Sequence, residues 1–117
     1  GVIVYSNQSK TRLCGVPVAM LEEYGAVSSQ VAIALAEGIR SRANTDWAVS
    51  VTGIAGPGGG SPEKPVGTVH IACSGTFGTT ERRFQFSGNR QEIRDQSATQ
   101  ALTLLLEGIS KVNRDSC

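Results

Sequence analysis

The stretch WAVSVTGIAGPGGG (residues 47–60) decides the fold, because within it a strand leads directly into a glycine-rich loop. Side chains alternate between the two faces from Trp47 to Thr52, which is the period of a β-strand. Five glycines then lie among the nine residues from Thr52 to Gly60. Their backbone N–H groups are candidates to hold an anion, and a plain surface loop is the alternative. Sites gather at strand ends, which favours the functional interpretation.

Other strands and helices are expected on both sides of this stretch. Strands are predicted at Val2–Tyr5, Val66–Cys73 and Thr79–Phe86, a polar turn at Ser6–Ser9, and helices at Val18–Tyr24, from Ser28 or Ser29 to about Asn44, and from Asn89 onward. In the last helix Asn89 and Glu92 resemble a capping box. The apolar stripe expected to face the core there consists of Ala98, Ala101, Leu102, Leu105, Ile109 and Val112. This mixture predicts an α/β fold, a three-layer α/β/α sandwich around a single mixed sheet with few hairpins.

The composition excludes several classes of protein. A chain of 117 residues with 39% hydrophobic and 18% charged side chains fits one folded domain, residues 1–117. Eleven basic residues against ten acidic ones, without a basic block, argue against nucleic acid as a partner, and no apolar run is long enough for a membrane. The cysteines Cys14, Cys73 and Cys117 indicate reduced thiols in the cytoplasm. With the lone His70, they predict no metal site.

Two smaller groups of residues are further candidates for a site. Lys10 follows Tyr5, Ser6 and Asn7, and a lysine there acts as a general base if partial burial lowers its pKa. A solvated turn is the alternative. Arg90 and Arg94 share a helix face near an N-terminus, which suits a phosphate or carboxylate, with ordinary surface charge as the alternative.

Four other residues or pairs are expected to be structural. We expect His70 on a sheet face, Cys73 in the core and Trp47 under a helix, and Arg82-Arg83 on the surface of a strand.

Together these motifs resemble one family. The motifs are Tyr5-Ser6-Asn7 with Lys10, Leu13-Cys14-Gly15-Val16, Gly25-Ala26-Val27-Ser28, Thr52-Gly53-Ile54-Ala55-Gly56-Pro57-Gly58-Gly59, Lys64-Pro65-Val66-Gly67-Thr68-Val69 and Phe86-x-Gly88-x-Arg90 with Arg94. The chain is similar, in the order and spacing of these motifs, to the C-terminal domain of competence/damage-inducible protein A (CinA). The resemblance runs from residue 1 to about residue 110.

The resemblance implies an amidohydrolase of pyridine-nucleotide salvage. Such a nicotinamide mononucleotide (NMN) deamidase converts NMN and water to nicotinic acid mononucleotide and ammonia, without a cofactor or a metal. It implies catalytic roles for Tyr5, Lys10, Thr52 and Arg90. Substrate binding is expected from Ser6, Asn7, Gly53, Ile54, Ala55, Gly56 and Arg94. A homo-oligomer is also expected.

One family feature lies outside this sequence. Family members carry a Ser-Cys-Thr-Gly-Gly run ahead of the first strand, and its serine is the expected nucleophile. This sequence holds no such run, so we expect the 117 residues alone to lack the family's N-terminal helix segment and to be incomplete for catalysis. A non-catalytic mononucleotide-binding or oligomerisation module is therefore the alternative function.

Overall fold

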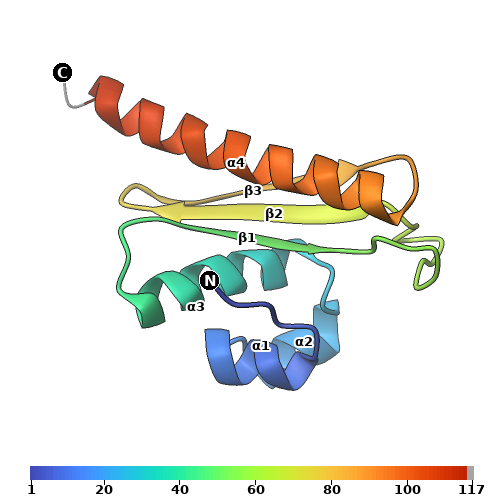
Figure 1. Cartoon of the computed structure of the whole chain (residues 1–117). Coiled ribbons are helices and arrows are strands. Elements are labelled where there is room, and N and C mark those ends of the chain that lie inside the picture. Colours follow the sequence, from blue (N-terminus) through green and yellow to red (C-terminus); the bar gives the residue numbers. More distant parts are fainter. Residues whose placement is uncertain (116–117) are drawn as a thin grey trace.

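The structure, a computed structural model, describes the backbone of residues 1–115, in which four helices accompany a three-stranded sheet (Figure 1). The elements are α1 (Asn7–Cys14), α2 (Val18–Tyr24), α3 (Ser29–Ala43), β1 (Ala48–Gly53), β2 (Thr68–Gly75), β3 (Gly78–Gln85) and α4 (Arg90–Asp115). The α/β class expected from the sequence is confirmed.

The sheet has the order β1-β2-β3, and both of its strand pairs are antiparallel. The expectation of a mixed sheet with few hairpins is therefore wrong. A tight turn at Thr76 and Phe77 joins β2 to β3, with Gly75 paired to Gly78, and a connection this short permits only an antiparallel return. The three strands predicted from Trp47 onward are confirmed within two residues at each end.

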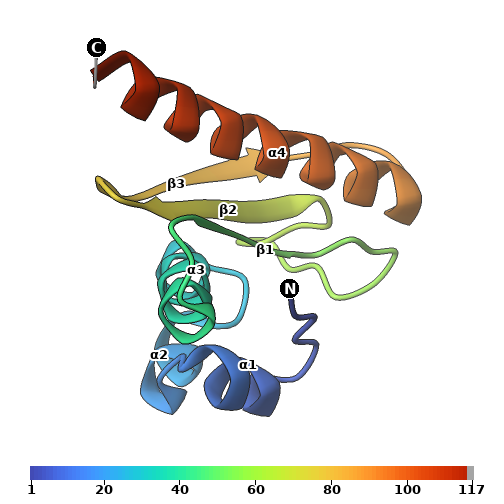
Figure 2. The same cartoon turned by 60° about the vertical axis from the view of Figure 1, so that its left-hand side comes forward.

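Helices lie on both sides of the sheet (Figures 1 and 2). On one side Val69, Ile71 and Cys73 of β2 form a core cluster, and the residues of α4 in this cluster are Ile93, Ala101 and Leu104. On the other side Ala72 packs against Ala32 and Ala36 of α3. Cys73 is thus a core residue, as expected, and the Trp47 indole packs under α4 against Gly108.

The N-terminal segment differs from the prediction. Among the described residues, Val2–Tyr5 belong to no strand, so the expected first strand is wrong. The predicted turn at Ser6–Ser9 is instead the start of α1, whose N-cap Ser6 accepts a hydrogen bond from the Ser9 backbone N–H (3.0 Å). Because the N-cap Ser6 directly follows Tyr5 and Lys10 donates to the Val4 carbonyl, the segment follows the helix rather than the sheet.

Helix α4 begins as expected but presents a different face to the sheet. Asn89 and Glu92 form reciprocal backbone-to-side-chain bonds of 3.0 and 2.9 Å, which confirms the capping box. The predicted stripe is wrong at Ala98 and Leu102, which are exposed, whereas Ile93 and Leu104 are buried. Ser97 occupies a core position because its hydroxyl donates to the Ile93 carbonyl (2.7 Å).

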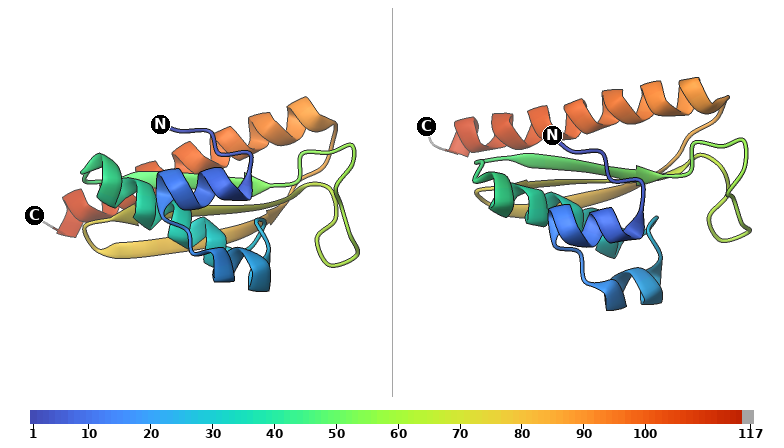
Figure 3. Two further views of the ribbon diagram at one scale, coloured as in Figure 1. Left: turned by 90° about the horizontal axis from the view of Figure 1, so that it is seen from below. Right: turned by 60° about the horizontal axis from the view of Figure 1, so that its bottom comes forward.

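The glycine-rich connection between β1 and β2 projects past the end of the sheet (Figure 3). Within the part of the chain that the structure describes, no helix is both long and apolar enough to span a bilayer.

Candidate functional site

A groove of about 710 Å³ lies between the N-terminal segment and the β1 side of the sheet. Its walls come from residues 1–5, α1, the segment just before α3, the middle and end of α3, and β1, and most of the lining residues are apolar, including Val27, Leu35 and Val49. Four of the predicted site residues line it, namely Tyr5, Lys10, Thr52 and Gly53. The fold therefore brings the ends of two distant motifs to one concave surface, as ligand sites usually require.

Lys10 supplies the only buried ammonium group among the described residues. It is 6% exposed, and its Nζ donates to the carbonyl of Val4 (2.8 Å) and, at the limit of bonding distance, to that of Tyr5 (3.5 Å). Burial lowers the pKa of Lys10 from the ordinary lysine value, while the nearby Cys14 thiol opposes this shift. An amine with a lowered pKa is present as the free base in a larger fraction of molecules near neutral pH, and a general base must be unprotonated.

The hydroxyl groups on the β1 wall of the groove are already engaged. Thr52 Oγ1 donates to the Ala26 carbonyl (2.7 Å), and Ser50 Oγ donates to the Ala32 carbonyl (2.6 Å). Thr52 is thereby held in place at the strand end, and its oxygen keeps lone pairs that can accept a bond from a ligand.

The rest of the glycine-rich loop lies outside the groove lining. Its backbone returns to the sheet through bonds of Ile54 N–H to the Thr68 carbonyl (3.0 Å) and of Gly67 N–H to the Ile54 carbonyl (2.8 Å). Ala55 packs against the core on the α4 side. Gly56 is buried with φ +80°, a conformation that glycine adopts without strain.

Arg90 joins this loop to α4. Its Nη1 donates to the Gly56 carbonyl (3.1 Å), so the first residue of the last helix holds the loop at the end of the sheet. Arg94 is exposed on the next turn, and Ser6 and Asn7 begin α1 outside the groove lining. The structure thus gathers Tyr5, Lys10, Thr52 and Gly53 and leaves the arginines at a separate edge.

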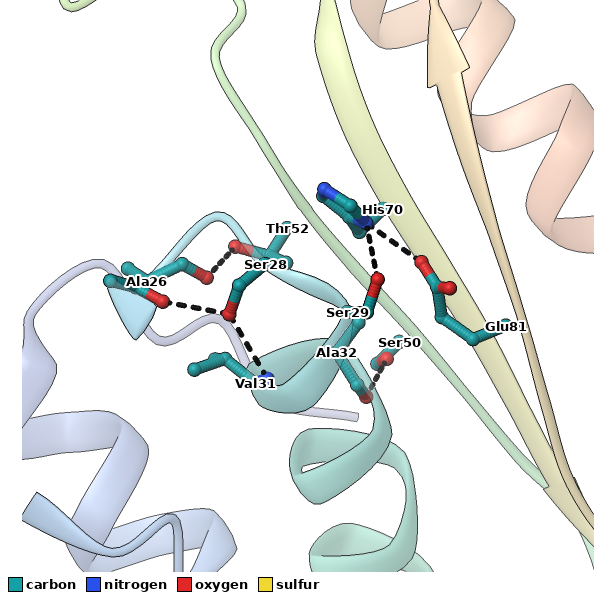
Figure 4. Close-up of polar contacts among 10 residues, drawn as sticks. Ala26, Ser28, Ser29, Val31, Ala32, Ser50, Thr52, His70 and Glu81 are labelled. Carbon is teal, nitrogen blue, oxygen red and sulfur yellow. Dashed lines mark hydrogen bonds and ion pairs between the residues drawn. The ribbon is translucent and has the colours of Figure 1, made fainter. Parts of the chain in front are cut away.

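A partly buried polar network around His70, behind the groove, was missed by the sequence analysis (Figure 4). His70 of β2 is 6% exposed, and its Nδ1 lies 2.7 Å from Glu81 Oε1 of β3 and 3.4 Å from Ser29 Oγ of α3. His70 is on a sheet face, as expected. Its partner Glu81 could have been found only from the hairpin register, which pairs His70 with Arg83 and Ala72 with Glu81, and the contact with Ser29 of α3 depends on how the helix packs on the sheet.

These three residues do not form a catalytic triad. In a triad the carboxylate and the hydroxyl bind opposite imidazole nitrogens, so that a proton moves between hydroxyl and ring. Here Ser29 and Glu81 both contact Nδ1 of His70, and the second ring nitrogen points away from them (Figure 4). The network therefore lacks the geometry for activating the serine.

The described residues hold no group of three or more His, Cys, Asp or Glu side chains placed to bind a metal ion. Both described cysteines are buried and free, and burial raises the pKa of the Cys14 thiol, which Arg42 and Lys10 partly offset. Cys14 is therefore held mainly as the neutral thiol beside the amine.

The fold and the groove define a small α/β domain with a buried amine on the wall of a mostly apolar groove. Residues 1–109 match the family model of the CinA C-terminal domain, and the chain belongs to that family. A CinA-like protein of Anaeromyxobacter dehalogenans is 52% identical over 105 residues, which cover 90% of this chain and 26% of that protein. One from Acidobacterium capsulatum is 53% identical over 105 residues, 90% of this chain and 25% of that protein. The chain thus spans about a quarter of the length of these curated relatives.

Two solved structures are also similar to this chain, in both fold and sequence. The competence/damage inducible protein CihA from Agrobacterium tumefaciens is 42% identical with a TM-score of 0.86, over 88% of this chain and 64% of that one. The competence damage-inducible protein A (ComA) from Klebsiella pneumoniae is 31% identical with a TM-score of 0.89, over 94% and 68%.

Proposed function

We propose that the groove binds the nicotinamide end of NMN, and that the complete protein hydrolyses its carboxamide to give nicotinic acid mononucleotide and ammonia. The observation that carries the proposal is the buried Lys10 amine on the wall of the groove shared with Tyr5 and Thr52. Family membership supports it, and the apolar walls suit a flat aromatic ring.

Each groove residue has a role in this proposal. Lys10, as the free amine, accepts the proton of the attacking oxygen and later returns it to the departing ammonia. Tyr5 stands beside this proton path, and Ser6 and Asn7 hold the start of α1. Thr52, with the backbone from Gly53 to Gly56, stabilises the oxyanion or the ribose phosphate.

In this proposal the phosphate of NMN binds at Arg90 and Arg94. Only one N–H of Arg90 is used on Gly56, so the guanidinium keeps further donors for a phosphate oxygen. Arg94 lies one turn away and adds positive charge. A mononucleotide would then extend from the groove along the strand end to α4.

The test is ammonia release from NMN by a protein that carries the complete family domain. Lys10→Ala is expected to lower kcat by about 100-fold or more, the usual effect of losing a general base. Lys64→Ala is the matched control, because Lys64 Nζ also donates to a backbone carbonyl, that of Tyr24 (2.7 Å), but lies outside the groove lining. Arg90→Ala should raise KM for NMN and leave the phosphate-free riboside little affected. Full activity of Lys10→Ala would refute the catalytic proposal.

A non-catalytic mononucleotide-binding module is the second candidate for these 117 residues. The hydroxyl groups of Ser50 and Thr52, which line the groove, donate to backbone carbonyls, and Lys10 Nζ contacts only backbone oxygens among the described residues. No activated nucleophile is therefore seen beside the amine in the described part of the chain. Calorimetry that finds NMN binding to this chain without ammonia release would favour this candidate.

We also propose that the chain self-associates in the cytoplasm. Large apolar side chains lie exposed on the surface, including Ile3 at 78% and Leu102 and Leu106 at 65% each, and association would cover such surface. Light scattering that finds only a monomer across a wide range of protein concentrations would contradict this.

A further inference from the structure

We propose that His70 and Glu81 are positioning residues for the groove: through Ser29 they fix the first turn of α3 and, with it, the wall formed by Ala26 and Val27. The carboxylate, imidazole and hydroxyl come from three elements, β3, β2 and α3 (Figure 4). This role is independent of which ligand the groove takes.

The Glu81 contact orients the imidazole. Glu81 Oε1 lies much closer to Nδ1 than Ser29 Oγ does, so the Nδ1 proton is donated chiefly to the carboxylate. The ring is thereby fixed in rotation, and Ser29 meets it from the side of the helix. Because the side chains of His70 and Glu81 are only 7% and 15% exposed, water cannot easily replace either partner.

A short series of contacts leads from Ser29 to the groove. Its neighbour Ser28 donates to the Gly25 carbonyl (2.9 Å) and accepts from the Val31 N–H (3.2 Å). Between these positions, the Ala26 carbonyl accepts the hydroxyl proton of Thr52 (2.7 Å), and Ala26 and Val27 line the groove.

The groove wall is therefore attached to the sheet at two places. Thr52 on β1 holds it from the groove side, and the His70–Glu81 pair on β2 and β3 holds it from behind. Thr52 and His70 are paired residues of adjacent strands, so both attachments rest on the same row of the sheet. Loss of the attachment through His70 and Glu81 should loosen the start of α3, and the packing of α4 on the other face of the sheet should not change.

Amide hydrogen exchange on the folded chain tests this positioning role. The probes are the amides of Val31 and Ala32, which bond to Ser28 Oγ and to the Ser28 carbonyl. The amide of Ile93, bonded to the Asn89 carbonyl at the start of α4, is the internal reference. Glu81→Ala should reduce protection at Val31 and Ala32 by about 10-fold or more, because the partly buried hydrogen bond between Glu81 and His70 is lost.

Two further variants separate positioning from general stabilisation. Glu81→Gln retains an oxygen that can accept the Nδ1 proton, so it should restore protection to within a few-fold of the unmodified chain. Glu107→Gln is the matched control, because it removes a carboxylate from an exposed ion pair on the α4 side. Unchanged protection at Val31 and Ala32 in Glu81→Ala overturns the proposal. An equal loss at Ile93 also overturns it, since the pair would then stabilise the whole fold without positioning the wall.

Discussion

The two sides of the sheet are held by different interactions, although the same central strand serves both. Toward α4, β2 presents Val69, Ile71 and Cys73 to an apolar cluster. Toward α3 it presents Thr68, His70 and Ser74, all buried and all hydrogen-bonded. Apolar packing is strong and tolerant of small shifts, whereas buried hydrogen bonds add little net stability but fix directions. The groove runs along β1, and the hydroxyl groups of Ser50 and Thr52 in its lining belong to the side whose geometry is fixed by hydrogen bonds.

The largest expected effect comes from truncating the α4 side. Ile71 is fully buried, and Ile71→Ala should lower the free energy of unfolding by about 2–5 kcal/mol through lost burial and a cavity. Ser74→Ala on the α3 side of the same strand, which removes one hydroxyl contact with Thr79, should cost only about 0.5–1.5 kcal/mol. Urea unfolding measures both, and equal losses would abolish the contrast between the two sides.

A second prediction concerns how closely α1 is held on the α3 side. A Cβ added at Gly38 of α3 would overlap with the Cys14 carbonyl at the end of α1. Gly38→Ala should therefore cost about 1–3 kcal/mol by overpacking, although alanine is the better helix former. Ser41→Ala, at an exposed position of α3, is the control and should change stability by less than about 0.5 kcal/mol. A stabilised Gly38→Ala variant would show that α1 can move freely, and Lys10 with it.

The third prediction concerns the buried amine of Lys10. Because burial lowers the pKa of Lys10, the unfolded chain binds its proton more tightly than the folded chain does. Stability should therefore rise with pH between the lowered pKa and the ordinary lysine value of 10.5. Below that window Lys10→Met should be the more stable protein, and its advantage should shrink as the pH rises through the window.

Urea unfolding at several pH values between 7 and 10.5 checks this, with Lys64→Met as the control for loss of a lysine outside the groove. An advantage of Lys10→Met that grows with pH would have the wrong sign for a buried amine.

The sequence predicted local features better than relations between elements. The alternation from Trp47 to Thr52 and the Asn89–Glu92 cap depend on neighbouring residues, and both are confirmed. The apolar stripe of α4 is only partly right because Ile93 and Leu104 satisfy the helical period as well as Ala98 and Leu102 do. Which set faces inward depends on how the helix crosses the sheet, and no local pattern records that.

The candidate site shows the same difference between local features, which the sequence predicts, and relations between elements, which it does not. The sequence marked Lys10 and Thr52, and the fold places both on one groove. It gave no sign that Ala26, an apolar residue, would hold Thr52 through its carbonyl, because any residue offers that group. Val2–Tyr5 has the composition of a strand, but the cap at Ser6 and the Lys10 bond to Val4 direct it along α1.

The smallest expected effect belongs to a charge pair on the α4 side, and it sharpens the contrast with His70 and Glu81. Arg82 and Glu107 lie 3.1 Å apart, but their side chains are 54% and 51% exposed, so water competes for both. Glu107→Gln should therefore cost less than about 1 kcal/mol, and even this difference should fade in high salt, which screens exposed charges. Unfolding in urea at low salt and at about 1 M salt, where the Debye length is short, measures the change. A cost above about 1 kcal/mol that persists in high salt would contradict the claim that exposure makes this pair weak.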